Sequence, residues 1–279
     1  MLLSAIVERR LTPTLTRLDI ENVHARASLS LFGGQLLSFV PKHDGRERLF
    51  LSERAHWDGS QPIRGGIPIC WPWFGAHKDD NNLPSHGYVR TRPWRLLENR
   101  DEDEHTRLIL EPEDCSGAGL DGSATLRLEV LVGRSLHLHL HTTNTGQQPF
   151  RLTTALHSYF LVDDVRACML EGLHGIYSDK TRDWAQLPTP TPYRFTGETD
   201  RIHLCTPGTV RLIEGDTRTV IGSCGHDSLV VWSPWSARSA HLPDMGVDDW
   251  IRMLCVETAV TQGMQLAPGA SHCLSQTIS

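Results

Sequence analysis

Leu126-Arg127-Leu128-Glu129-Val130 and Leu136-His137-Leu138-His139-Leu140 alternate apolar and polar side chains at every step. A period of two over this length is typical of a strand with one buried and one solvated face. Comparable runs occur at 27–32, 152–160, 228–232 and 251–256. A helical period of 3.6 is hard to find, and 23 Gly and 16 Pro residues punctuate the chain. The sequence therefore predicts an all-β fold, a sandwich of many antiparallel strands.

The length favours one domain over residues 1–279, because large all-β domains often exceed about 200 residues as a single unit. We find no internal repeat. Two stretches are predicted to be exposed loops. Residues 98–105 are dense in acidic side chains, and residues 187–192 alternate Pro and Thr.

Composition and charge exclude several classes of protein. A net charge of −6 and a pI near 6.2 give no basic field for nucleic acid. No apolar run approaches the roughly 18 residues of a membrane span. Residues 1–7 reach Glu8-Arg9-Arg10 without a basic segment before them, and seven scattered cysteines include no C-x-x-C pair. We therefore expect a cytoplasmic protein with reduced thiols and neither a nucleic-acid nor a membrane partner.

The most unusual segment runs from Arg64 to Gly75 and is followed by 83–90. Its Gly and Pro residues give an irregular backbone, and Trp73, with its neighbour Trp71, offers flat faces on which sugar rings stack. A rigid aromatic loop packed on the sandwich is the alternative, and clustered aromatics by themselves favour it.

Arg64 and Arg90 bracket this segment. A guanidinium fork suits a phosphate group better than an ammonium group does. For either arginine taken singly, a solvated surface position is the alternative.

A histidine and a glutamate are the candidate acid and base. On a strand over 152–160, His157 lies opposite the face formed by Leu152, Leu156 and Phe160. A structural histidine is the alternative, because spacing alone does not make a histidine catalytic.

Glu257 follows the apolar run 251–256 and shares a strand face with Ile251, Met253 and Cys255. A carboxylate at the end of an apolar stripe needs a partner or a function, because unpaired burial is costly. A buried glutamate held by an arginine or by backbone amides is the alternative.

His137, His139 and His141 would share one strand face, and histidine is a common metal ligand. A cupin-like metal site would add a carboxylate a few residues later, whereas 142–146 reads Thr-Thr-Asn-Thr-Gly. This pattern favours a polar outer face. No P-loop and no G-x-S-x-G motif occurs, so nucleotide hydrolysis and acyl transfer have no support.

Together these segments resemble the glucose-6-phosphate 1-epimerase branch of the aldose 1-epimerase family, in family order over about residues 30 to 260. The motifs that carry the resemblance are Gly33-Gly34-Gln35, Arg64-Gly65-Gly66-Ile67-Pro68, Trp71-Pro72-Trp73-Phe74-Gly75, His86-Gly87-Tyr88-Val89-Arg90, Leu156-His157-Ser158-Tyr159-Phe160, Thr199-Asp200-Arg201, Val230-Val231-Trp232-Ser233-Pro234-Trp235 and Cys255-Val256-Glu257. The resemblance implies a β-supersandwich of the galactose-mutarotase type that uses neither a metal nor an organic cofactor.

The resemblance also implies a catalytic pair. His157 resembles the general acid that protonates the ring oxygen, and Glu257 resembles the general base that takes the anomeric hydroxyl proton. The ring then opens to an aldehyde that rotates and recloses. An imidazole and a carboxylate cover both proton transfers near neutral pH.

The remaining roles concern substrate binding. His86 resembles the second active-site histidine of the family, and Asp200 the carboxylate that binds ring hydroxyls. Arg64 and Arg90 match arginines that grip a 6-phosphate. Ser85 departs from the pattern, because some relatives carry a basic residue there.

The expected function is therefore the interconversion of the α and β anomers of a hexose 6-phosphate, with glucose 6-phosphate favoured, by a monomer whose partner is the sugar phosphate. Two alternatives stay open. An epimerase of free hexoses would need the pair but not the arginines. A non-catalytic carbohydrate-binding β-sandwich would not need His157 and Glu257 together.

Overall fold

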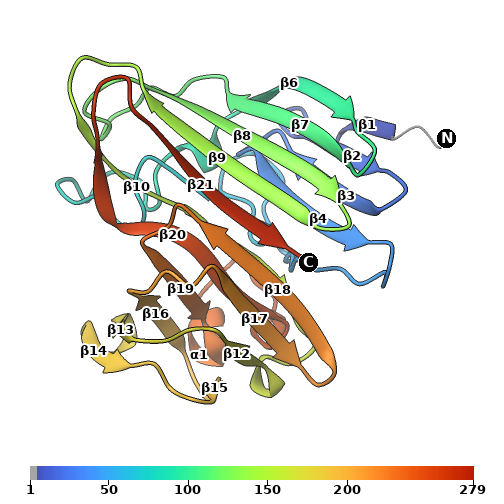
Figure 1. Ribbon diagram of the computed structural model, residues 1–279, viewed down its shortest axis with the longest axis vertical. Coiled ribbons are helices and arrows are strands. Elements are labelled where there is room, and N and C mark those ends of the chain that lie inside the picture. The colour runs from blue at the N-terminus through green and yellow to red at the C-terminus, as the bar shows by residue number, and fades with distance from the viewer. Residues whose placement is uncertain (1–4) are drawn as a thin grey trace.

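The computed structural model describes residues 5–279, and in this range the chain is built mainly of strands that pair antiparallel in three sheets (Figure 1). Residues 1–4, which carry part of the expectation about export, lie outside the described residues. Within 5–279 no helix has the length and apolar character needed to cross a membrane. The predicted all-β class is confirmed.

The largest sheet contributes one wall of the core. In sheet order it contains β15 (Tyr193–Arg194), β12 (Met169–Glu171), β17 (Thr209–Glu214), β18 (Thr217–Cys224), β21 (Ser271–Ile278), β9 (Leu136–Asn144), β8 (Ala124–Gly133), β7 (His105–Pro112) and β6 (Trp94–Asp101). In Figure 1, β8, β9 and β21 lie side by side in the upper half of the view.

The second sheet faces the first across the core. Its order is β14 (Ala185–Pro188), β13 (Ile176–Asp179), β16 (Thr199–His203), β19 (Ser228–Ser233), β20 (Met253–Leu266), β10 (Phe150–Leu156) and β5 (Ile69–Cys70), and β11 (Tyr159–Leu161) also pairs with β20. A third sheet consists of β1 (Ala5–Arg10), β2 (Thr16–Glu21), β3 (Ala25–Ser30) and β4 (Gln35–Pro41).

Helical segments in the described range are short. They are α1 (Trp235–Ser239) and the 3₁₀ turns η1 (Val89–Thr91), η2 (Val165–Ala167), η3 (Lys180–Arg182) and η4 (Asp249–Ile251). They lie in the connections between strands, and three of them, η1, η3 and α1, contribute side chains to the site described below.

Strand alternation decides which face is buried. In β19, Leu229 and Val231 point into the main hydrophobic core, while Val230 points to the opposite face. In β20, Val256 points into the core and Glu257 does not. The second sheet therefore has one face on the core and one face available for function.

The histidine stripe forms a polar outer face, as expected. His137, His139 and His141 alternate with buried leucines on β9. His139 Nδ1 lies 2.9 Å from the Ser275 hydroxyl, and His137 Nδ1 lies 3.1 Å from the Thr277 hydroxyl. These hydroxyls on the neighbouring β21 give His137 and His139 hydrogen-bond partners.

Both predicted loops are partly wrong. Residues 98–101 belong to β6, and residues 187–188 belong to β14. Each of these strands lies at the edge of its sheet. An edge strand needs a partner on one side only, so it tolerates charged side chains and a terminal proline that resemble a loop in sequence.

Two predicted strands also differ in detail. The run 152–160 is divided between β10 and β11 by His157 and Ser158, although the two faces alternate as predicted. Ile251 lies in η4, so it does not share the strand face of Glu257.

Candidate active site

Six of the seven side chains predicted to form a site line one cavity of about 240 Å³. The six are Arg64, His86, Arg90, His157, Asp200 and Glu257, and the other lining residues are Phe74, Ser85, Tyr159, Lys180, Val230, Trp232, Arg238 and Leu242. The cavity is somewhat smaller than those that hold drug-sized ligands, so its size suits one small polar molecule.

Strand register builds the floor of this cavity. Asp200 on β16 pairs with Trp232 on β19, and Val230 on β19 pairs with Glu257 on β20. The pairings of β20 with β10 and β11 have the same register, which sets His157 opposite Glu257. Paired residues point to the same face, so these side chains gather on the face away from the core.

His157 and Glu257 are in contact, with Nε2 and Oε1 3.4 Å apart. The His157 amide leaves the ladder and donates to the Pro68 carbonyl at 3.0 Å. Its ring stacks on the ring of Tyr159, with the two ring centroids 5.0 Å apart. Within residues 5–279, His157 Nδ1 and Glu257 Oε2 are buried without hydrogen-bond partners, which leaves each group one polar atom for a ligand.

Burial moves the pKa values of the pair in opposite directions. It raises the pKa of Glu257 well above its ordinary value, and Asp200 adds to this effect while Lys180 opposes it. Burial, together with the Arg90 and Arg64 charges, lowers the pKa of His157 to about 3. Both effects favour neutral forms, so the empty pair tends to hold a single proton, on Glu257.

His86 is held as a hydrogen-bond donor toward the cavity. Its amide donates to the Gly75 carbonyl at 2.7 Å, and its Nδ1 accepts from the Gly75 amide at 3.3 Å. The Cys70 thiol lies 3.4 Å from the same nitrogen. Because an amide can only donate, Nδ1 carries no proton, and the neutral ring must carry it on Nε2. Burial, with His157 and Arg90, lowers the pKa of His86, which keeps the ring neutral.

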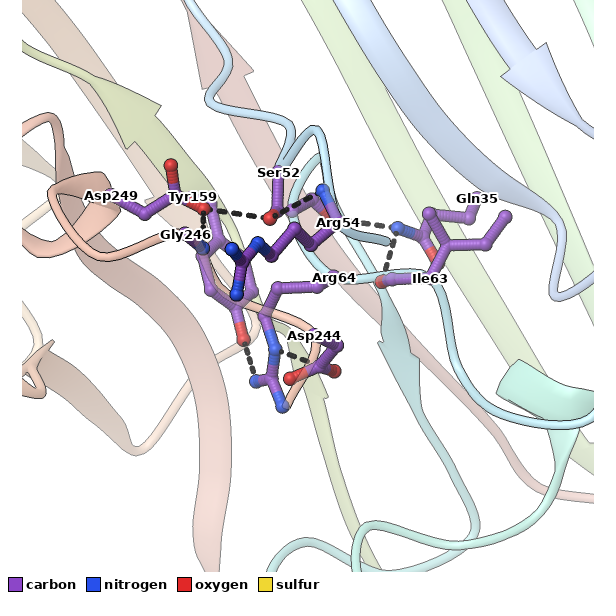
Figure 2. A network of polar contacts seen from close by, with 10 residues as sticks. Gln35, Ser52, Arg54, Ile63, Arg64, Tyr159, Asp244, Gly246 and Asp249 are labelled. Carbon is purple, nitrogen blue, oxygen red and sulfur yellow. Dashed lines mark hydrogen bonds and ion pairs between the residues drawn. The ribbon is translucent and has the colours of Figure 1, made fainter. Parts of the chain in front are cut away.

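Arg64 is anchored from two sides (Figure 2). Its Nε donates to Asp244 at 3.0 Å, and Nη1 donates to the Tyr159 hydroxyl at 2.9 Å. Burial opposes the charge, but Tyr159 and Asp244 raise the pKa of Arg64 above its ordinary value. The remaining N–H groups of the fork are left for a ligand.

Arg90 is the central residue of η1. Its Nη2 donates to the Ser85 carbonyl at 2.7 Å, and in the part of the chain that the structure describes no carboxylate pairs with it. The residue that departs from the family pattern thus contributes a backbone acceptor that orients Arg90. The uncompensated charge faces the cavity.

Lys180 and Arg238 are cavity residues that sequence reasoning missed. Lys180 on η3 binds Asp200, with Nζ and Oδ1 3.1 Å apart, and Arg238 lies on α1. Neither stands out from ordinary surface charges in the sequence, because only folding brings η3 and α1 to this face. Tyr159 could have been found, since it follows His157 by two residues and shares its strand face.

Trp73 is the predicted site residue that the structure places elsewhere. It is 6% exposed, belongs to the main core and donates from Nε1 to the Pro84 carbonyl at 2.9 Å. Its ring packs against Tyr88 and His77. The aromatic loop therefore packs on the sandwich, and Phe74 and Trp232 provide the aromatic surface of the cavity.

One group in the described range has the spacing of metal ligands, namely His157, Cys255 and Glu257, whose ligand atoms lie within 4.8 Å of one another. Burial raises the pKa of the Cys255 thiol and of Glu257, so both favour protonated forms that bind cations poorly. The nearby positive charges of Arg64 and Arg90 also oppose a cation. The surroundings suit proton transfer and an anion better than a metal ion.

Comparison with known families matches residues 16–279 to the model described as aldose 1-epimerase. A protein of Cenchrus ciliaris, provisionally named glucose-6-phosphate 1-epimerase, is 35% identical over 260 residues, or 87% of this chain and 78% of that protein. A protein of Salmonella typhimurium with the same provisional name is 31% identical over 283 residues, or 99% of this chain and 94% of that protein.

Solved structures confirm the predicted galactose-mutarotase type of fold. A Salmonella typhimurium protein provisionally described as a mutarotase superposes with a TM-score of 0.88 at 30% identity, over 99% of this chain and 96% of that one. Galactose 1-epimerase of Lactobacillus acidophilus superposes with a TM-score of 0.76 at 15% identity, over 100% and 98%, and shares the fold.

Proposed function

The chain belongs to the aldose 1-epimerase family, and from this premise we propose that it interconverts the α and β anomers of a hexose 6-phosphate, with glucose 6-phosphate favoured. The observation that carries this proposal is a single cavity in which His157 and Glu257 lie 3.4 Å apart beside cationic side chains. The enzyme is then an isomerase of carbohydrate metabolism that needs no cofactor.

The pair exchanges two protons with the sugar. Glu257 takes the proton of the hydroxyl on carbon 1 as His157 gives a proton to the ring oxygen, and the bond between carbon 1 and the ring oxygen breaks. The aldehyde rotates about the bond between carbons 1 and 2, and the ring recloses on its other face. Closure returns both protons, so the pair ends as it began.

The reactive form of the pair requires a charged His157 and an ionised Glu257. A neutral His157 and a protonated Glu257 together hold the same number of protons as the charged pair. The 3.4 Å contact between Nε2 and Oε1 offers a path for the proton from Glu257 to His157. A phosphate dianion beside Arg64 and Arg90 would offset the charges that lower the pKa of His157. Substrate binding would thus favour the reactive form.

The charge of the cavity supports a phosphorylated substrate over a free hexose. Arg64, Arg90, Lys180 and Arg238 face it, against the carboxylates of Asp200 and Glu257. Arg64, Lys180 and Arg238 each pair with a carboxylate, on Asp244, Asp200 and Glu198 respectively, so the excess positive charge rests on Arg90. A neutral sugar would gain little from it, whereas guanidinium forks bind phosphate in a bidentate manner. The names of the two relatives support the same substrate.

The test is an anomer-exchange assay, by NMR or polarimetry, on glucose, galactose and glucose 6-phosphate in parallel. We expect exchange of the phosphorylated sugar and little of the other two. Arg90→Ala should lower kcat/KM for glucose 6-phosphate about ten- to a hundredfold, because hydrogen bonds to charged groups contribute about 1.5–3 kcal/mol. Arg64→Ala should do the same, although it also frees Asp244.

Arg95→Ala is the matched control. Arg95 lies on the edge strand β6, pairs with Glu111 on the neighbouring β7 and does not line the cavity. Equal use of glucose and its 6-phosphate by the wild type would favour an epimerase of free hexoses. If the arginine variants lost activity equally toward glucose and glucose 6-phosphate, this result would also favour an epimerase of free hexoses.

The catalytic pair has its own test. Glu257→Gln and His157→Asn should each lower exchange about 10²- to 10⁴-fold with the fold retained, because each removes one end of the proton transfer. Chelators should leave exchange unchanged. A variant of the pair with near-normal exchange would refute the acid and base assignment, whereas a wild type without exchange activity would favour a non-catalytic carbohydrate-binding role for the site.

We further propose that one domain and one copy of the chain suffice, because a single chain supplies every residue of the cavity described above. A cytoplasmic location is supported by seven cysteines that are all unpaired. Neither membrane nor nucleic acid has a part in the proposed reaction.

A further inference from the structure

A buried glutamine reaches across the core to the strand that carries Glu257. Gln276 lies on β21 in the first sheet, is 1% exposed and takes a core position between Leu274 and Ile278. It also lies beyond Cys255-Val256-Glu257, the last motif of the family resemblance. An amide in an apolar core costs stability unless its polar atoms find partners, so its contacts show why the chain keeps it there.

The strand interruption beside His157 leaves one carbonyl without its ladder partner. Ser158 and Val256 lie opposite each other, because β10 and β11 pair with β20 in one register. A hydrogen-bonded pair in an antiparallel ladder exchanges two N–H···O bonds. Here the Val256 amide donates to the Ser158 carbonyl at 3.2 Å, but the Ser158 amide donates to the Leu156 carbonyl at 3.0 Å. The Val256 carbonyl is therefore open to a different donor.

Gln276 supplies that donor. Its Nε2 donates to the Val256 carbonyl at 3.3 Å and to the Thr258 hydroxyl at 2.9 Å. Its Oε1 accepts from the Ser158 hydroxyl. Because a carbonyl can only accept, the amide nitrogen must lie on the Val256 side, which fixes the orientation of the side chain. The glutamine thus fills the gap in the ladder from the core side.

These contacts reach both members of the catalytic pair through the backbone. Ser158 directly follows His157, whereas Val256 and Thr258 flank Glu257. Strand alternation turns the three neighbours toward the core and the two catalytic side chains toward the cavity. A change in the core contacts therefore alters the 3.4 Å separation of the pair and leaves the cationic side chains of the cavity in place.

The contacts of Gln276 belong to a network that joins both large sheets. The Thr258 hydroxyl also lies 2.7 Å from the Ser223 hydroxyl on β18. Ser158 and Thr258 are 0% exposed, so the network lies in a medium of low dielectric constant. A satisfied polar network in such a medium makes a core rigid and favours one arrangement of its strands.

We propose that Gln276 is a positioning residue that sets the separation and orientation of His157 and Glu257 from the core. Its effect on anomer exchange rests on the proposed function. A misplacement of the reacting groups by about 1 Å can lower a rate about a hundredfold. Loss of the glutamine should therefore lower kcat, while the affinity for the phosphate, which the arginines provide, should change little.

Kinetics of Gln276→Met test this role, because methionine keeps the length of the side chain and removes its polar atoms. We expect kcat for glucose 6-phosphate to fall roughly ten- to a hundredfold and KM to change less than about twofold. Ser158→Ala, which removes one hydrogen bond of the network and adds no bulk, should lower kcat in the same direction by less. It decides the question if Gln276→Met does not fold.

Asn144→Leu is the matched control. Asn144 on β9 is 0% exposed, and its side-chain amide also donates to a β20 carbonyl, that of Leu266 at 2.8 Å. Leu266 is the last residue of β20, at the end remote from Glu257. Asn144→Leu should lower the urea midpoint of unfolding, as Gln276→Met does, and leave kcat unchanged. An equal loss of kcat in both variants would overturn the positioning role, and so would an unchanged kcat in folded Gln276→Met.

Proton–nitrogen NMR of the His157 ring gives a readout that does not depend on activity. Gln276→Met should shift the ring resonances of His157, and Asn144→Leu should leave them as in the wild type. A wild type that exchanges no hexose phosphate would overturn the proposed function. The resonances then decide alone, since a shift specific to Gln276→Met supports the positioning role and unchanged resonances overturn it.

Discussion

Glu257 is 1% exposed, and its Oε2 atom has no hydrogen-bond partner within residues 5–279. A buried polar atom without a partner costs about 1–3 kcal/mol of stability. Proton transfer explains why such a group is kept, because the raised pKa that burial imposes makes a carboxylate a stronger base. Stability and activity are therefore opposed at this residue.

Glu257→Gln should be more stable than the wild type at pH 8 and close to it at pH 4. Because burial raises the pKa of Glu257 above its ordinary value of 4.5, the folded state binds more protons than the unfolded state above that pH. The free energy of unfolding of the wild type then falls as pH rises above 4.5, and glutamine, which does not titrate, removes this dependence. Urea unfolding at both pH values measures it. Lower stability of the variant at both would mean that the carboxylate anchors the fold.

His86 is expected to act through its Nε2 proton alone. Glutamine places its amide nitrogen near the position of Nε2, whereas asparagine reaches only that of Nδ1. His86→Asn should therefore lower kcat/KM for glucose 6-phosphate about three- to tenfold, the value of one hydrogen bond, and His86→Gln should lose less. Proton–nitrogen NMR of the histidine rings reads the tautomer directly. A proton on Nδ1 of His86 would contradict this assignment whatever the kinetics.

At the scale of elements, the site depends on where ladders stop. His157 interrupts the strand between β10 and β11, so its amide binds a loop carbonyl while the register on both sides is kept. His86 lies in a loop with a φ of 66° and is followed by Gly87, which forms a parallel bridge with Trp71. Two irregular segments thus bring the rings of His86 and His157 together, with their centroids 5.5 Å apart.

Gly87→Ala should be far more costly than Gly45→Ala. Both glycines have positive φ, 72° and 68°, so both variants lose about 1–2 kcal/mol to backbone strain. A Cβ at Gly87 would also collide with the Trp71 carbonyl oxygen, whereas one at Gly45 meets nothing within 4 Å. We expect a further loss of about 1–3 kcal/mol for Gly87→Ala and a loss of exchange as His86 moves.

Thermal and urea unfolding of the two variants measure the difference in stability, and the exchange assay measures the displacement of His86. Equal destabilisation of Gly87→Ala and Gly45→Ala would mean that the backbone at Trp71 moves aside for the new Cβ at little cost in free energy. The close approach of Gly87 would then have no part in positioning His86.

At the scale of the whole molecule, charge is distributed unevenly. The chain is acidic, yet four cationic side chains line the cavity and Arg90 has no carboxylate partner in the described range. A positive cavity attracts an anion over distances that salt shortens to about 10 Å at 0.1 M. The charge that lines the cavity is set by the fold rather than by composition.

The KM for glucose 6-phosphate should rise several-fold between about 0.02 M and about 0.3 M monovalent salt, while kcat changes little. Screening weakens the attraction of the cavity for the dianion but does not reach the buried proton transfer. Initial exchange rates at several salt concentrations measure both constants. Potassium chloride and sodium chloride should act alike, and a KM independent of salt would mean that the cationic residues do not bind the phosphate.

The sequence by itself determined the all-β class and most of the strands, because alternation with a period of two is a local property that survives folding unchanged. It also singled out six residues of the cavity, since their motifs resemble those of one family. It placed His157 on the face away from the core, which strand alternation alone predicts, and it placed Glu257 at the end of an apolar stripe.

Only the tertiary structure decided which side chains share the cavity. Trp73 and Phe74 are adjacent in sequence, yet the first packs in the core and the second lines the cavity. Lys180 and Arg238 resemble surface charges until η3 and α1 fold over the same face of the second sheet. The edge strand β6 resembles a loop in sequence for the same reason. Exposure and proximity depend on contacts between segments far apart in the chain, and local patterns do not contain them.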